Sequence, residues 1–250
     1  MPKNKKAGQT SATKKLPTLE MIIALAGFIA GMLAKLSFEQ VQHLLTNKNT
    51  VLRKKLLEVF EITKDEFAEV RVEWEKFYLD NFGITTDFSS VVIPPKPIEG
   101  YWRLIFVAQG ITMNSTLAVM RTLFQVGVYT DDPDKDVTVN TRTSVMGYAT
   151  WVRKGVESDK KYLNKSTHQV DPDGKIGITF LERMILEIRY FLETGSNLDV
   201  RGITLCTGSR YSDGDVPNMY FNPHTDEVRL DASDTNDAGS DLGLREAVAL

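Results

Sequence analysis

The densest group of polar and turn-forming residues lies at Gly208–Asp215, in the sequence GSRYSDGD. Arg210 carries a guanidinium, which can hold a carboxylate or phosphate through two parallel hydrogen bonds. The two glycines of this stretch permit tight turns that expose backbone N–H groups. We therefore predict that Ser209, Arg210, Asp213 and Asp215 form a ligand-binding loop, with an anionic group on a small ligand or a protein partner as the target.

Two alternatives share the same residues. Serine, aspartate and glycine also build ordinary turns between strands, and Arg210 would then simply pair with a neighbouring aspartate. If Asp213 and Asp215 are instead held close together and partly buried, they can bind a cation or act as acid and base. The protein would then be a metal-assisted hydrolase or nuclease. The C-terminal acids available to such a site are Asp226, Asp231, Asp234, Asp237 and Asp241.

Signatures of catalysis and of metal binding are missing from the sequence. The three histidines, His43, His168 and His224, have no cysteine or histidine at zinc-ligand spacing. There is no Walker A or G-x-G-x-x-G motif, and no EF-hand spacing in the acidic tail. Cys206, the only cysteine, lies in an apolar ITLCT run and is expected to be a buried, inert thiol. We predict no cofactor, no metal and no catalytic residue, which favours a non-catalytic binding module.

Charge is distributed unevenly along the chain, and this supports a nucleic-acid-binding alternative. Residues 1–60 hold ten Lys and Arg against three acids, whereas residues 205–250 hold three Arg against nine acids. A basic arm over residues 1–17, including Lys14 and Lys15, is predicted to be disordered. The helices expected over residues 37–61 resemble a helix-turn-helix. The phosphate contacts would come from the basic run Arg53, Lys54 and Lys55.

An uncharged stretch follows the arm at Met21–Ala34. It is shorter than the roughly 20 residues that a membrane span needs, and its small residues suit close helix packing. A packed helix is the favoured interpretation, with a membrane-associated or secretory segment as the alternative. A single cysteine cannot form an intramolecular disulfide, so we expect a reducing, cytoplasmic location.

The elements that position these residues predict an α+β fold. The N-terminal region, residues 18–86, is expected to be helical, with an aromatic stripe around Trp74 and Phe77 and a glycine stop at Gly83. PPKP (Pro94–Pro97) indicates a rigid linker to a mixed α/β domain at residues 98–250.

Within that domain we predict a mixed sheet packed with two main helices. RLIFVA, a helix from Asn114 to Phe124 and VGVYT form one strand–helix–strand unit. The second helix opens at a capping box formed by Thr179 and Glu182 and ends at Gly195. The remaining predicted strands are GYATWVR, ITLCT, NMYF and EVRL, the last two forming a hairpin around NPHTD.

Several stretches of residues 36–250 are similar to a family of uncharacterised proteins from uncultivated bacteria. They are LSFEQVQ, RLIFVAQGIT, GYATWVR, GITFLERMILEIRYFLETG, TLCTGSRYSDGDVP and LREAV. The family has no assigned activity, so the resemblance implies no catalytic residue and no substrate. It does imply that the stretches belong to one architectural unit.

Overall fold

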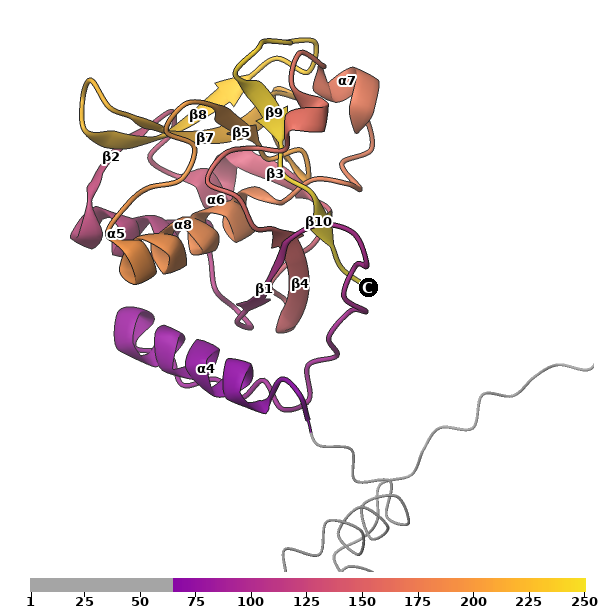
Figure 1. Ribbon diagram of the computed structural model, residues 1–250. Coiled ribbons are helices and arrows are strands. Elements are labelled where there is room, and N and C mark those ends of the chain that lie inside the picture. The colour runs from indigo at the N-terminus through magenta and orange to yellow at the C-terminus, as the bar shows by residue number, and fades with distance from the viewer. Residues whose placement is uncertain (1–64) are drawn as a thin grey trace, which may run out of the picture. The chain divides into compact units, whose positions relative to one another are not determined.

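The computed structural model describes residues 65–250, which form a compact unit from Glu66 to Leu250. The basic arm, the Met21–Ala34 segment and the Arg53–Lys55 run lie outside the described residues. The predicted α+β class is confirmed, because helices and two main sheets share the unit (Figure 1). Among residues 65–250, no helix is long and apolar enough to cross a membrane.

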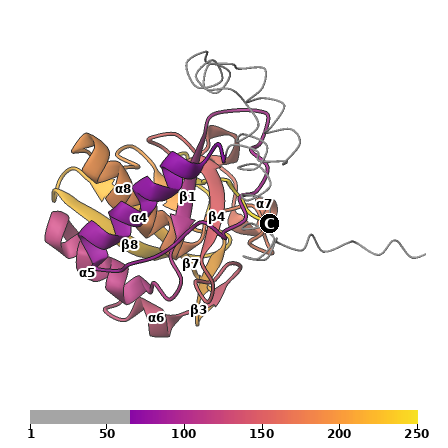
Figure 2. The ribbon, with the colours of Figure 1, turned by 90° about the horizontal axis from the view of Figure 1, so that it is seen from below.

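Helix α4 (Ala68–Phe82) carries the predicted aromatic stripe. Trp74, Phe77 and Tyr78 are buried, and the Tyr78 hydroxyl donates to the carbonyl oxygen of Phe106 (2.8 Å). The helix ends at Gly83 with φ 67°, as predicted, because a left-handed residue favours glycine. Figure 2 shows α4 crossing β1, so this helix packs into the same core as the strands that follow it.

A three-stranded sheet joins distant parts of the chain in the order β1-β4-β10. Strand β1 (Trp102–Val107) is antiparallel to β4 (Tyr148–Arg153), with Trp102 opposite Arg153. The short strand β10 (Ala247–Val248) adds to the other edge of β4. The predicted strands RLIFVA and GYATWVR are confirmed.

A five-stranded sheet has the order β2-β8-β7-β5-β9. The hairpin of β7 (Val216–Asn222) and β8 (Glu227–Ser233) is confirmed, and β2 (Gln125–Val128) runs parallel to β8. Strands β5 (Ile203–Leu205) and β9 (Leu242–Leu244) complete the sheet. The predicted strand–helix–strand order is confirmed, and its two strands, β1 and β2, belong to different sheets.

Two helices lie between the sheets, as Figure 1 shows. The N-cap of helix α5 (Met113–Leu123) is Thr112 rather than Asn114, two residues earlier than predicted. Helix α8 (Phe180–Thr194) has the predicted capping box and glycine stop. It is buried on nearly every side over its first nine residues, whereas Leu192, near its C-terminal end, is 45% exposed.

Short elements connect the layers. They are α6 (Pro133–Asp136), β3 (Val137–Asn140), η1 (Lys160–Tyr162), α7 (Thr167–Val170) and β6 (Ser209–Tyr211). The antiparallel pair β3–β6 was not predicted, and it places three of the eight residues of the polar GSRYSDGD stretch in a strand.

Candidate functional site

The polar side chains at Ser209 and Arg210 of the predicted loop form hydrogen bonds within the protein. Ser209 is buried, and its hydroxyl donates to Asn140 Oδ1 (2.6 Å) and accepts from the backbone N–H of Phe180 (2.9 Å). Arg210 pairs with no aspartate: its Nη1 donates to the carbonyl oxygens of Thr207 (2.6 Å) and Ser209 (2.7 Å). Partial burial also lowers the pKa of Arg210. The guanidinium is thus half-buried against its own loop.

Asp213 and Asp215 lie at the turn between β6 and β7. The carboxylate of Asp213 is exposed and accepts the backbone N–H of Asp215 (3.1 Å). Desolvation and the charges of Asp213, Asp234 and Asp237 raise the pKa of Asp215, so these acids lie near one another. Within residues 65–250, however, no group of three or more His, Cys, Asp or Glu is arranged to hold a metal ion.

The remaining candidates for chemistry are separated from one another. His168 and His224 are exposed, whereas Cys206 is fully buried, and burial raises the pKa of its thiol. His43 lies outside the described residues. The Ser209 hydroxyl forms hydrogen bonds with the side chain of Asn140 and with the backbone N–H of Phe180. No histidine among residues 65–250 is bonded to it, so none of them activates it.

A pocket of about 210 Å³ at the β1–β4 end of the molecule has three cationic residues in its lining. We call it the Arg103 pocket; it is lined by Arg103, Arg153, Lys154, Gly155, Val156, Leu186, Tyr190 and Leu198. The side chain of Arg103 lies on the α8 face of the sheet, whereas that of Arg153 lies on the opposite face with Trp102. A larger cleft of about 680 Å³, beside residues 84–92, contains a single charged lining residue, Asp87. Cations therefore concentrate at the smaller pocket, and the polar residues of GSRYSDGD line neither.

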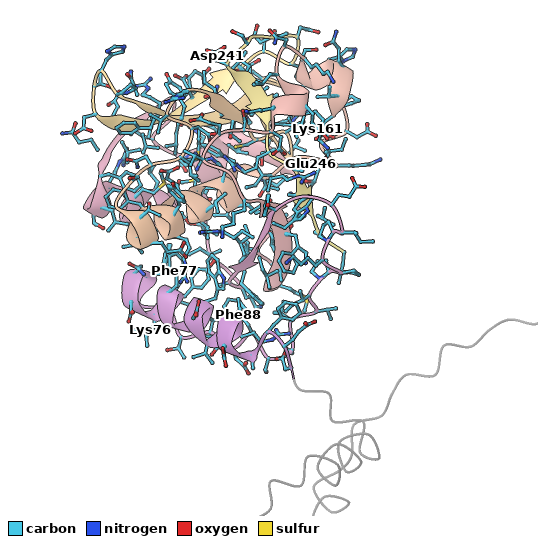
Figure 3. The ribbon with its side chains drawn as sticks, viewed as in Figure 1. Lys76, Phe77, Phe88, Lys161, Asp241 and Glu246 are labelled. Atoms are coloured by element: carbon cyan, nitrogen blue, oxygen red, sulfur yellow. The ribbon has the colours of Figure 1, made fainter. Side chains whose placement is uncertain are left out.

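Arg153 is fixed by three kinds of contact. Its guanidinium lies 4.3 Å from the centroid of the Trp102 ring, and its Nε donates to Glu246 Oε2 (2.9 Å). Gly100 (φ 88°) approaches so closely that an added Cβ would lie 1.5 Å from Arg153 Nη1. Glu246 also accepts from Lys161 (2.5 Å), and Figure 3 shows these two side chains together. The Arg153 guanidinium is therefore held rigidly on the Trp102 face of the sheet.

Glu246 stays ionised in this arrangement. Burial disfavours its charged form, but hydrogen bonds from Lys161, Tyr162 and Arg153 outweigh burial and lower the pKa of Glu246. Arg153 and Glu246 therefore form a stable ion pair (2.9 Å) on the Trp102 face of the sheet.

Arg103 has an incomplete set of partners. Its Nη2 lies 2.7 Å from Glu193 Oε2, whereas its Nη1 is buried without a hydrogen-bond partner. Among the described residues, four buried polar side-chain atoms lack a hydrogen-bond partner. Of these four, only the Arg103 atom belongs to a residue that lines the pocket. Buried donors are nearly always satisfied in folded proteins, so such an atom calls for an explanation.

Four fully buried charged residues hold the walls of this pocket. We call them the buried quartet: Arg183, Glu187, Asp199 and Arg245. Arg245 donates to the carbonyl oxygens of Arg153 (3.0 Å), Gly155 (2.7 Å) and Val156 (3.1 Å). Its Nη2 also lies 3.1 Å from Asp199 Oδ1. The wall segment at residues 153–156 is therefore anchored from behind.

The other half of the quartet anchors Leu198. Glu187 Oε1 accepts the backbone N–H of Leu198 (3.1 Å), and Glu187 Oε2 lies 2.6 Å from Arg183 Nη1. Arg183 reaches Asp199 through Nη2 (2.8 Å), which closes the chain of ion pairs. Burial opposes the charge on Arg183, but Glu187 and Asp199 raise its pKa. The quartet carries two positive and two negative charges and is structural.

Arg103, Arg153 and the buried quartet were not predicted from the sequence. One signal was present: Arg183 and Glu187 stand four residues apart inside the most apolar stretch of α8, where a helix rarely keeps unpaired charges. The position of Arg103 beside a pocket depends on the pairing of β1 with β4, which the sequence does not contain locally.

Comparison with protein-family models, with curated proteins and with solved structures found no match to this chain.

Proposed function

We propose that residues 66–250 form a non-catalytic binding module that recognises a small anionic ligand at the Arg103 pocket. One observation carries the proposal: the buried Nη1 of Arg103 has no hydrogen-bond partner and belongs to a residue that lines a pocket together with Lys154. An unsatisfied buried donor costs about 1–3 kcal/mol. A bound anion would recover that energy once the guanidinium turns toward it.

The lining supports binding rather than chemistry. It contains no carboxylate, imidazole, thiol or aliphatic hydroxyl, and Lys154 and Tyr190 are the two lining residues of a type that can act as a base or a nucleophile. The three cations come from two paired strands and the segment that follows β4, all of which are anchored by buried contacts. The segment at residues 153–156 is therefore fixed, whereas the guanidinium of Arg103 must turn from its buried position to meet a bound anion.

The test is thermal unfolding of the full chain in acetate, phosphate or sulfate, at constant ionic strength with chloride as reference. A ligand present at 100 times its dissociation constant stabilises the folded state by about 2.7 kcal/mol. We expect at least one of the three anions to raise the melting temperature of the wild type. The shift should shrink in Arg103→Met and in Lys154→Met, the second of which alters only an exposed residue.

Arg210→Met is the matched control, because this arginine is also partly buried but lines neither pocket. It should keep the full shift. The proposal is overturned if none of the anions raises the melting temperature, or if the shift survives in both pocket variants. A shift lost only in Arg210→Met would instead assign binding to the GSRYSDGD loop.

A further inference from the structure

We infer that the ligand of the Arg103 pocket is a singly charged carboxylate with a compact apolar body. This inference rests on the proposed function and names the class of anion. Three features of the pocket select that class: its charge balance, the apolar part of its lining and the commitment of its backbone carbonyl groups.

The charge balance favours one negative charge. Arg103 already pairs with Glu193 (2.7 Å), and Arg153 pairs with Glu246 (2.9 Å). Lys154 is the lining cation that forms no ion pair among the described residues. A carboxylate adds one charge and matches this surplus. A phosphate monoester carries about −1.5 to −2 charges at neutral pH, and the excess would repel Glu193, the partner of Arg103.

The apolar part of the lining selects a hydrocarbon body. Val156, Leu186 and Leu198 contribute it, with the ring of Tyr190 beside them. Inorganic phosphate or sulfate would leave this surface without a partner, whereas a branched acid covers it. The volume of about 210 Å³ is below the roughly 300–1,000 Å³ typical of sites for drug-sized ligands, so the body must be small.

The wall at residues 153–156 presents few free acceptors to the ligand. The carbonyl oxygens of Arg153, Gly155 and Val156 all accept hydrogen bonds from Arg245. Carbonyl oxygens repel an anion, so their commitment to Arg245 removes a source of repulsion from the site. Through Arg245, the buried quartet therefore both holds the wall rigid and reduces the repulsion that an anion would meet there.

A free branched acid and the last residue of a peptide offer the same chemistry. Calorimetric titration of the full chain with isobutyrate and with N-acetylglycylvaline distinguishes these two sources. Acetate, isobutyramide and inorganic phosphate complete the set. We expect isobutyrate or the peptide to bind about tenfold more tightly than acetate, because two further carbons are buried. Isobutyramide, which lacks the charge, should show no binding.

Two variants locate the recognition. Lys154→Met should weaken isobutyrate about tenfold, because it removes the surplus charge, and Val156→Ser should weaken isobutyrate while leaving acetate unchanged. Binding of phosphate through Arg103, without binding of either carboxylate, overturns this inference and leaves the proposed function intact. Equal binding of isobutyramide and isobutyrate also overturns it. If none of the anions binds, both the inference and the proposed function fail.

Discussion

The carboxylate of Asp199 lies 2.8 Å from Nη2 of Arg183, and neither side chain has any exposed surface. Asp199 also accepts from the Thr204 hydroxyl (2.6 Å) and from Arg245 (3.1 Å), so its two oxygens serve three side chains. A buried charge is tolerated only when it is paired and hydrogen-bonded in this way. The Asp199 carboxylate is therefore expected to contribute strongly to the free energy of unfolding of this unit.

Asp199→Asn should lower the free energy of unfolding by about 3–5 kcal/mol, because it leaves two buried guanidinium groups short of a counter-charge. Urea unfolding followed by circular dichroism measures the loss. Asp226→Asn is the matched control, since both aspartates have φ 54° but Asp226 is exposed. The control should change stability by less than about 0.5 kcal/mol. Equal effects of the two substitutions would contradict a structural role for the buried quartet.

The pair of Glu182 and Arg142 predicts acid sensitivity. Arg142 donates to both carboxylate oxygens (2.6 and 2.7 Å), and the Tyr148 hydroxyl adds a third hydrogen bond (3.0 Å). Burial opposes ionisation, but the charge and hydrogen bonds of Arg142 lower the pKa of Glu182 below its ordinary value of 4.5.

A lowered pKa means that the folded state binds the proton less readily than the unfolded state does. The stabilisation from Glu182 is therefore present above pH 4.5 and is lost as the pH falls through the lower pKa of the folded protein. Unfolding free energies measured from about pH 6 to pH 3 should decline. Glu182→Gln should be less stable at pH 6 and should show a shallower decline. A curve parallel to that of the wild type would contradict this assignment.

Gly100→Ala should destabilise the protein and weaken anion binding. An added Cβ would meet Arg153 Nη1 at 1.5 Å, in addition to the strain of φ 88°. Gly214→Ala is the control for backbone strain, because Gly214 has φ 99° with no atom within 4 Å of an added Cβ. Strain alone costs about 1–2 kcal/mol. Thermal unfolding should show a larger loss for Gly100→Ala, and its anion-induced shift should be the smaller.

Arg210→Ala tests the residue that the sequence favoured. Because the guanidinium holds two carbonyl oxygens of its own loop, we expect a loss of about 0.5–1.5 kcal/mol in unfolding free energy, with anion binding retained. Calorimetric titration with the best anion measures the binding. If the folded Arg210→Ala variant no longer binds the anion, the binding site is in the GSRYSDGD loop instead of the Arg103 pocket.

The sequence predicted those helix ends and turns that depend on residues close to one another along the chain. The capping box of Thr179 and Glu182, the glycine ends at Gly83 and Gly195, and the β7–β8 hairpin depend on residues close in sequence. The assignment of β1 and β2 to different sheets depends on partners far along the chain. The same holds for the Arg103 pocket, whose wall segment at residues 153–156 is held by Arg245.

The burial of Cys206 offers an experimental advantage. This thiol is the only one in the chain, it has no exposed surface, and burial raises its pKa, so little reactive thiolate is present in the native protein. A cysteine introduced at an exposed position beside the pocket can therefore be coupled to a fluorescent dye without removing the natural one. The native chain is, in effect, already prepared for an optical reporter of ligand occupancy.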